Sequence, residues 1–172
     1  LAEKSALLHP GPAKEFVSGE GFRYLGRSYR LLLVDDQDVP LKLEAGRFKL
    51  RRSEAGRGRE HFVAWYKTHA LAWFRRRVRL FGPRIGADPA RVEVRDLGYR
   101  WGSCGHAGGV NFHWQTLLLP ANAVDYVVVH ELVHLREANH TPAFWTRVER
   151  VLPDFAQRKA WLATNGAGAT GL

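Results

Sequence analysis

The sequence of 172 residues predicts an α+β fold in one compact domain. Residues 21–50 contain short segments rich in aromatic and branched side chains, separated by glycine and aspartate turns, which is the pattern of strands. Residues 60–81 carry apolar side chains near helical spacing, and a second helix is predicted over 123–137, where the segment Val124–Leu135 is apolar almost all round. Hydrophobic residues make up 45% of the chain and aromatic residues 12%, which is enough to fill a core.

The first part of the chain is expected to form an arm, a β unit and a long helix. Residues 1–19 show no periodicity and predict an irregular arm. Residues 20–56 predict a small antiparallel β unit, with strands at 22–25, 28–34, 39–43 and 47–50 and a charged linker at its end. The helix over 60–81 is expected to end at Gly82-Pro83.

Residues 57–166 are expected to form the functional core, followed by a loose tail over 167–172. A strand over 91–96 and a hairpin with arms at 99–104 and 110–118 are predicted before the second helix. Because side chains alternate along a strand, one face of the second arm points to the core and the other away from it. The core face would carry Val110, Phe112 and Trp114, and the opposite face Asn111, His113 and Gln115.

The last three helices have recognisable starts. Asn122 looks like the N-cap of the helix over 123–137, with Asp125 as a capping-box-like partner three residues later. Thr141-Pro142 is a strong N-cap and first-turn signal for the next helix. Pro153 is expected to start a final helix that runs to about Thr164.

The segment His130-Glu131-Leu132-Val133-His134 predicts a metal site. Two histidines four residues apart lie on one helix face, with Cβ atoms roughly 5–6 Å apart, close enough to bind one ion. Glu131 lies beside them, where a carboxylate can accept a proton without being a ligand; this arrangement is a metalloprotease signature. The alternative is a buried helix with two hydrogen-bonded histidines. Burying these polar groups in an apolar helix is costly unless a cation compensates, which favours the metal site.

The third ligand is predicted to be His140, with Glu149 as the runner-up. His130 and His140 have the spacing of a longer metzincin pattern, but Glu137 replaces its glycine, and the chain has no methionine for the accompanying Met-turn. The metzincin interpretation therefore fails. Asn139 is the candidate for the turn that returns the chain to the metal, because Asn tolerates left-handed backbone angles.

The net charge of +9 is concentrated outside the metal motif, with +6 in residues 61–100. The basic segment 75–79 has two interpretations: a surface for nucleic acid or an acidic partner, or the solvated face of an amphipathic helix. The lack of a nucleic-acid-binding motif favours the second. The single cysteine, Cys104, excludes an intrachain disulfide, and residues 1–20 lack the apolar core of a signal peptide. We therefore expect a cytoplasmic monomer with no membrane partner.

Several segments together closely resemble the YgjP-like metallopeptidase family, which is related to the SprT-like and WLM zincins. The resemblance runs from about Gly21 to Gly166 and is most specific over 98–145. The segments are Arg100-Trp101-Gly102-Ser103-Cys104, Gly108-Gly109-Val110, Trp114, Pro120, 125–134, Asn139-His140 and Phe144-Trp145. The chain departs from the family at His113-Trp114-Gln115, where Asn-Trp-Arg is usual, which puts any role of that Asn or Arg in doubt.

The resemblance implies a minimal zincin fold, in which a short antiparallel sheet packs on the metal helix. It also implies that His130, His134 and His140 bind Zn²⁺ and that Glu131 is catalytic. The expected reaction is hydrolysis of peptide bonds in a peptide or protein substrate. The alternatives are hydrolysis of a non-peptide bond, such as a nucleotide phosphoanhydride, or a non-catalytic zinc-stabilised binding module associated with nucleic acid.

Three further residues are candidates for substrate binding. Asn111 and His113 would line a cleft if the wet face of the hairpin borders the metal, and Arg100 would stabilise an oxyanion or form a structural salt bridge, the second being favoured. Cys104 has no evident base beside it in the sequence. A small buried side chain is therefore expected at this position rather than a nucleophile.

Overall fold

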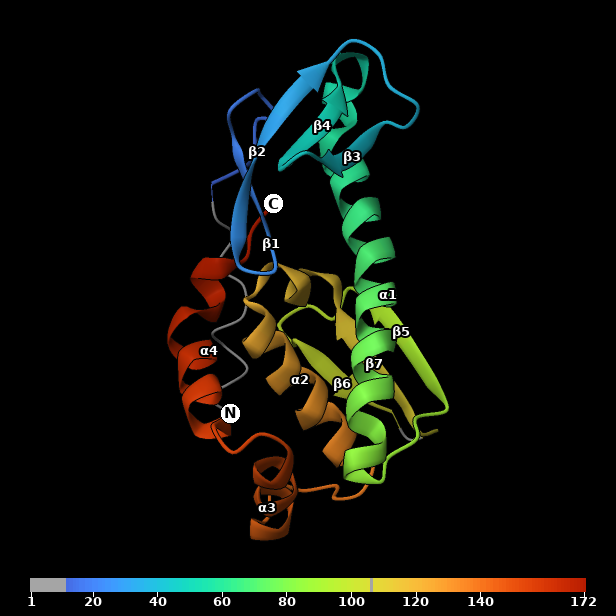
Figure 1. Ribbon diagram of the computed structural model, residues 1–172, viewed down its shortest axis with the longest axis vertical. Coiled ribbons are helices and arrows are strands. Elements are labelled where there is room, and N and C mark those ends of the chain that lie inside the picture. Colours follow the sequence, from blue (N-terminus) through green and yellow to red (C-terminus); the bar gives the residue numbers. More distant parts are fainter. Residues whose placement is uncertain (1–11, 106) are drawn as a thin grey trace.

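The computed structural model describes residues 12–105 and 107–172, and it shows a sheet at one end, a mixed helix and sheet body at the other, and one long helix along both (Figure 1). The α+β class predicted from the sequence is confirmed. The strands are β1 (Gly21–Tyr24), β2 (Arg27–Val34), β3 (Leu41–Glu44), β4 (Arg47–Arg51), β5 (Arg91–Arg95), β6 (Gly102–Cys104) and β7 (Gly109–His113). The helices are η1 (Arg52–Arg57), α1 (Gly58–Ile85), η2 (Trp114–Leu118), α2 (Ala121–His134), α3 (Pro142–Val151) and α4 (Phe155–Ala169).

The two sheets are mixed rather than antiparallel throughout. The order β1-β2-β4-β3 contains two antiparallel hairpins whose second strands, β2 and β4, pair in parallel. The order β5-β7-β6 likewise contains a parallel pair, β5 with β7, beside the antiparallel pair of β6 and β7. The prediction of purely antiparallel sheets is therefore wrong for one pair in each sheet. Within each sheet, successive strands of the chain run in opposite directions, so β2 and β4 run in the same direction, as do β5 and β7. When such strands lie side by side, they pair in parallel.

The first hairpin also joins the two ends of the molecule. Its turn uses Leu25 and Gly26, both with positive φ (50° and 80°), as a tight hairpin turn requires. The backbone N–H groups of this turn donate to the carbonyl oxygens of Leu117 and Leu118 at 2.8 and 3.0 Å. A Cβ atom on Gly26 would lie 2.9 Å from the Cα of Pro120, so only glycine permits this approach. The turn therefore anchors the N-terminal sheet to the start of α2.

Helix α1 contributes to both hydrophobic clusters of the core. Phe62 and Tyr66 pack under the N-terminal sheet, and Phe74 packs in the lower body, where its ring stacks on Phe112 at 4.2 Å. The helix does not end at Gly82-Pro83, as the sequence predicted, but continues to Ile85. It stops at Gly86, which has a left-handed conformation and whose N–H bonds back to the carbonyl of Gly82. Burial of Phe81, Gly82 and Ile85 in the last turns offsets the cost of a proline inside a helix.

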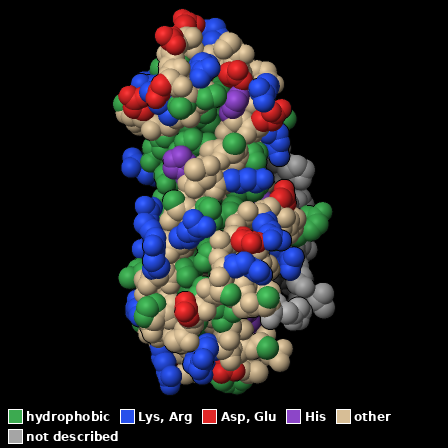
Figure 2. All heavy atoms as spheres, turned by 90° about the vertical axis from the view of Figure 1, so that its right-hand side faces the viewer, with side chains coloured by type: hydrophobic (Ala, Val, Ile, Leu, Met, Phe, Trp, Pro, Cys, Tyr) green, Lys and Arg blue, Asp and Glu red, His purple; other side chains and the backbone are tan. Residues whose placement is uncertain are grey.

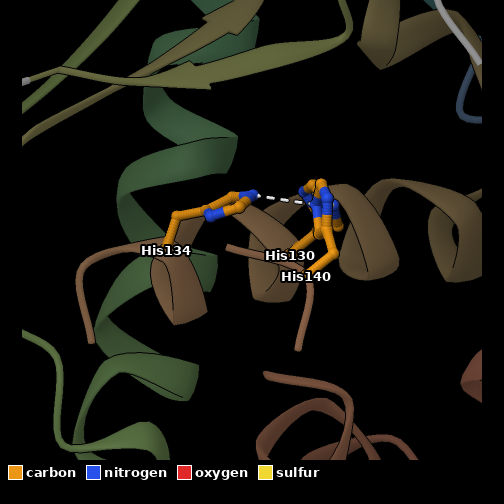
Figure 3. Close-up of side chains that lie close together, drawn as sticks. All are labelled: His130, His134 and His140. Atoms are coloured by element: carbon orange, nitrogen blue, oxygen red, sulfur yellow. Dashed lines mark hydrogen bonds between the residues drawn. The ribbon is translucent and has the colours of Figure 1, made fainter. Parts of the chain in front are cut away.

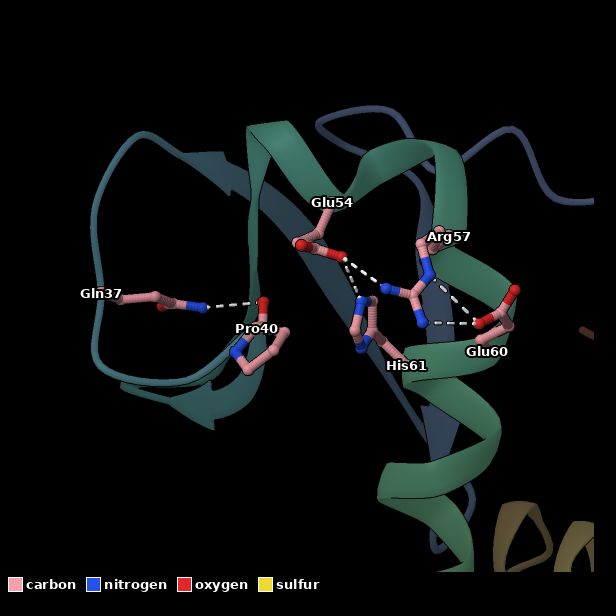
Figure 4. Close-up of polar contacts among 6 residues, drawn as sticks. All are labelled: Gln37, Pro40, Glu54, Arg57, Glu60 and His61. Carbon is pink, nitrogen blue, oxygen red and sulfur yellow. Dashed lines mark hydrogen bonds and ion pairs between the residues drawn. The ribbon is translucent and has the colours of Figure 1, made fainter.

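A polar cluster holds the start of α1 against the β unit (Figure 4). The Glu54 carboxylate lies 2.6 Å from His61 Nε2 and 3.8 Å from an Arg57 guanidinium nitrogen. Arg57 also pairs with Glu60 at 3.0 Å. The hydrogen bond from His61, followed by nearby positive charge, lowers the pKa of Glu54. The 3₁₀-helix η1 and the start of α1 thus stand where the sequence predicted a charged linker at the end of the β unit.

Helix α2 begins at Ala121, with Pro120 at the N-cap position and no side-chain cap. The prediction that Asn122 is the N-cap and Asp125 its partner is therefore wrong. Asp125 instead accepts two hydrogen bonds from the Arg77 guanidinium, at 2.7 and 2.6 Å. A bidentate pair with a partly buried arginine is stronger than a local backbone bond, so the tertiary partner prevails.

Two further segments differ from the sequence predictions, one after β7 and one at the end of α4. The second hairpin arm, predicted over 110–118, ends at His113, and residues 114–118 form the 3₁₀-helix η2 with Trp114 buried. The strand stops there because the His113 ring accepts the N–H of Gln115 and caps η2. Helix α4 runs to Ala169, into the segment predicted as a loose tail. Residues 1–11 of the predicted arm lie outside the described residues, and 12–20 contain neither helix nor strand. The division into arm, β unit, core and tail stays a prediction.

No helix in the described ranges is both long enough and apolar enough to cross a membrane.

Candidate metal centre

Three histidines converge at the end of α2 (Figure 3). His130 and His134 come from the last turns of the helix, and His140 comes from the loop that leads to α3. The Nε2 atom of His140 lies 3.0 Å from that of His130 and 3.1 Å from that of His134. These residues form one group whose ligand atoms lie within 4.8 Å of one another.

The hydrogen bonds at the outer ring nitrogens set the tautomers of two of these histidines. His134 Nδ1 lies 3.2 Å from the carbonyl oxygen of Glu137, which only accepts, so Nδ1 carries the proton in the neutral ring. His130 Nδ1 lies 3.2 Å from the Glu131 carboxylate, which imposes the same tautomer. Both rings therefore direct an Nε2 lone pair towards His140. His140 Nε2 can carry one proton, so it can donate a hydrogen bond to only one of these two lone pairs.

This donor set fits a zinc ion. Neutral imidazole nitrogens bind zinc at about 2.0–2.1 Å, which places tetrahedral ligand atoms about 3.3 Å apart. The observed 3.0 and 3.1 Å separations are close to that value. An outer N–H donated to a carbonyl or carboxylate is also the usual support of a metal-binding histidine. Burial, and then the neighbouring His130, lower the pKa of His134, which favours the neutral form that binds metal.

Helix α3 supplies the apolar floor of the cluster. The buried ring of Phe144 contacts all three histidine rings, with centroid separations of 4.6–5.2 Å. The Trp145 ring stacks on the His140 ring and on the Phe155 ring, with centroid separations of 5.6 and 5.5 Å. The exposed third histidine is therefore supported by two stacked aromatic rings. Thr141 begins α3 as predicted, since its hydroxyl accepts the N–H of Phe144 at 3.4 Å. Helix α3 thus packs against α2 in the same hydrophobic cluster.

The loop between α2 and α3 returns the chain without the turn expected at Asn139. Among the described residues other than glycine, positive φ occurs only at Phe16, Leu25 and Ala45, so the left-handed prediction for Asn139 is wrong. The Val133 carbonyl instead accepts the N–H groups of Arg136 and Glu137, which spreads the reversal over several residues. The Glu137 carboxylate pairs with Arg147 of α3 at 3.0 Å. This pair links the loop to α3.

Glu149, the alternative third ligand, lies exposed on α3 and does not belong to the histidine group. The helix turns of α3 that face the cluster are occupied by Phe144 and Trp145. The structure therefore brings His140, and not Glu149, to the other two histidines.

Glu131 is 7% exposed and lies against strand β6. A Cβ atom on Gly102 would lie 2.8 Å from the Glu131 Cγ and 3.1 Å from the Asn111 carbonyl oxygen. Gly102 thus permits a close approach of the strand to the carboxylate side chain. Its importance was not predicted, because nothing in the local sequence indicates which helix residue the strand covers.

Replacing this glycine is expected to move Glu131. In Gly102→Ala the new methyl group displaces the carboxylate, and we expect kcat/KM for peptide hydrolysis to fall by about 10- to 100-fold, as for a misplacement near 1 Å. Metal content, measured by elemental analysis at saturating Zn²⁺, should stay unchanged because the atoms nearest to the new methyl group belong to Glu131 and Asn111 and not to the three histidines. Gly105→Ala is the matched control, since its Cβ would meet nothing closer than 3.7 Å. Equal activity of the two variants would contradict a positioning role for Gly102.

The three other predicted site residues lie apart from the histidine group. Asn111 is half-buried and its amide donates to Ser103 Oγ at 3.3 Å across the hairpin. His113 is 2% exposed, with Nδ1 accepting from the Gln115 N–H and Nε2 3.3 Å from Asp96. Its predicted orientation away from the core is wrong, because its ring caps the 3₁₀-helix η2. A role for Asn111 and His113 in substrate binding stays a prediction.

Arg100 is exposed and forms no ion pair with an acid in 12–105 or 107–172, so its favoured structural salt bridge does not form there. Its alternative role at an oxyanion stays a prediction. Cys104 is half-buried rather than buried, and burial, with the Glu131 charge as the second cause, raises the pKa of its thiol. A raised pKa keeps the thiol protonated and agrees with the expectation that Cys104 is not a nucleophile.

Comparison with known proteins identifies one family and one similar solved structure. The sequence model of the YgjP-like family, described as a metallopeptidase domain, matches residues 1–165. A search of the curated proteins finds no match. The crystal structure of the metallopeptidase zymogen of Pyrococcus abyssi abylysin is similar, with 22% identity and a TM-score of 0.49 over 53% of this chain and 92% of that one. Because the family model spans nearly the whole chain, the protein belongs to the YgjP-like family and is a metal-dependent peptidase.

Proposed function

We propose that the protein is a zinc-dependent peptidase in which His130, His134 and His140 hold the ion and Glu131 is the general base. One observation carries this proposal: the Nε2 atom of His140 lies 3.0 Å from that of His130 and 3.1 Å from that of His134, and the nearly buried Glu131 carboxylate lies beside His130. Two of the three rings have the tautomer that presents a lone pair at this point. The arrangement matches the three-ligand donor set of catalytic zinc sites.

The chain's own groups then divide the work of hydrolysis. A bound zinc ion supplies Lewis acidity, which lowers the pKa of water and polarises a carbonyl. Glu131 accepts a proton from the attacking water and delivers it to the amine leaving group. The lack of a side chain at Gly102 leaves space for this carboxylate beside β6. The His130 Nδ1–H bond to the same carboxylate fixes it from the other side.

Strand β6 is suited to align the substrate. It lies at the edge of its sheet, paired with β7 on one side. An extended peptide can add to such an edge through main-chain hydrogen bonds, largely independent of side-chain identity. Because Gly102 of β6 contacts Glu131, a peptide bound along this strand would pass next to the general base. This arrangement favours unfolded or extended protein segments as substrates.

Metal removal tests the proposal. Purified protein should cleave an unfolded protein substrate, lose this activity after dialysis against a chelator, and regain it when Zn²⁺ is added in equimolar amount. Peptide products are followed by gel electrophoresis and mass spectrometry, with a serine-protease inhibitor present in every sample to exclude a contaminant. A parallel sample contains nucleoside triphosphates, and released phosphate is measured. Turnover of nucleotides without proteolysis would refute the peptidase assignment in favour of a phosphoanhydride hydrolase.

A further inference from the structure

Helix α1 carries a long cationic surface that the metal centre does not use. From His61 to Ala87 the sequence contains six Lys or Arg residues and no acid. Of these, Arg77 is neutralised by Asp125. Arg75, Arg76 and Arg79 are exposed, and none of them pairs with an acid in the part of the chain that the structure describes. Figure 2 views this side of the molecule and shows Lys and Arg side chains over its middle and lower parts, where acids are fewer than at the upper end.

A groove runs between α1 and the edge strand β5 beneath these charges. It consists of two adjoining hollows of about 530 and 470 Å³ that share Arg75 and Val92 as lining residues. Arg79 lines the first hollow and Lys67 the second, so cations border the groove along its α1 side. The floor is apolar and includes Val78. None of the lining residues belongs to the histidine group.

The acids in the groove do not cancel its charge. Glu93 lines one hollow, but it contacts Arg95 and lies 3.9 Å from Arg91, so its charge is matched within β5. Asp88 lines the other hollow. The groove thus has one uncompensated acid, Asp88, and three cations, Lys67, Arg75 and Arg79. The groove is therefore a net cationic channel with an apolar floor.

We propose that this groove binds the sugar–phosphate backbone of a single-stranded nucleic acid. Lys67, Arg75 and Arg79 follow one another along one side of α1, at rises of about 12 and 6 Å. A line of cations beside a sunken channel matches the regularly spaced phosphates of one strand, which positively charged grooves track without reading sequence. Guanidinium groups also bind phosphate oxygens through two parallel hydrogen bonds.

The shape of the groove favours a single strand over the other polyanions. A channel between a helix and a strand receives one chain, whereas a duplex presents its phosphates on a broad convex surface. The apolar floor, with Val78 and Val92, gives sugars and bases a surface that the carboxylates of an acidic peptide would not use. No aromatic side chain lines either hollow, so the binding is expected to be electrostatic and strongly dependent on salt.

Fluorescence anisotropy with a labelled mixed-sequence single-stranded oligonucleotide, measured at several salt concentrations, tests this site. The double variant Arg75→Gln/Arg79→Gln should bind at least about 10-fold more weakly at low salt. The slope of log affinity against log salt should become shallower by about 1.4, at 0.7 for each lost phosphate contact. Both arginines are exposed, so the thermal midpoint of unfolding should not change.

The matched control is Arg47→Gln/Arg150→Gln, which removes the same charge at exposed positions on β4 and α3. Its affinity for the oligonucleotide should change by less than about 3-fold, as expected from a change in net charge alone. An equal loss in both double variants would overturn the groove as the site. Tighter binding of a duplex, or equal binding of polyglutamate through the same arginines, would overturn the choice of a single strand.

Discussion

Glu131→Gln is expected to abolish peptide hydrolysis while the protein keeps its metal. The amide has nearly the shape of the carboxylate, and its oxygen can still accept the hydrogen bond from His130 Nδ1, so the ligand stays oriented. The amide cannot accept the proton of the attacking water. Loss of a general base lowers the rate by about 10²- to 10⁴-fold, and kcat on an unfolded protein substrate measures this directly. Metal content by elemental analysis should equal that of the unchanged protein.

Glu137→Gln is the matched control for this variant. It removes the same charge close to the metal centre, from a carboxylate that pairs with Arg147 of α3. We expect a change of less than about 3-fold in kcat, because the carbonyl that orients His134 belongs to the main chain. Retention of both metal and full activity in Glu131→Gln would refute the general-base role. It would favour a zinc-stabilised binding module instead.

His140→Ala is expected to remove the metal and all activity with it. Loss of an outer partner of a metal ligand already costs about 10- to 100-fold in affinity, and loss of a ligand should cost more. The affinity for Zn²⁺ is measured by competition with a chromophoric chelator. Circular dichroism of the metal-free variant should match that of the metal-free parent, because His140 is exposed and the core beneath it is formed by Phe144.

Glu149→Ala distinguishes the two candidates for the third ligand. Glu149 is exposed on α3 and lies outside the histidine group, so its loss should leave affinity and activity unchanged within about 2-fold. The opposite result, with metal lost from Glu149→Ala and kept by His140→Ala, would show that the chain rearranges to a two-histidine, one-glutamate site. The pair of variants therefore tests the identity of the ligand and not merely the presence of a metal.

Much of the candidate site follows from local covalent geometry, which is why the sequence predicts it. The helical rise places His130 and His134 on one face whatever surrounds them, with Glu131 beside them. The start of α3 at Thr141 follows from the hydrogen-bonding capacity of one hydroxyl and the fixed backbone angle of one proline. Periodicity also predicts the α+β class and the approximate position of almost every element, since burial repeats with the period of a helix or a strand.

Other features depend on contacts between elements that are distant in the sequence. Asp125 could cap α2 locally, but Arg77, 48 residues away, binds it in two places. Proline 83 would end an isolated helix, but burial of the last turn of α1 keeps it helical. In each case the two alternative local structures differ in free energy by a few kcal/mol at most, and the packing free energy of the whole core outweighs that difference.

The sequence by itself determined the class of the fold, two of the three converging histidines and the carboxylate beside them, because these depend on spacing within single elements. Only the tertiary structure decided which strands pair in parallel, that His140 and not Glu149 lies beside the other two histidines, and that Gly102 of β6 lies against Glu131. The physical reason is that a side chain's neighbours from other elements are chosen by the free energy of the complete core. That energy is a property of the folded chain and of no segment within it.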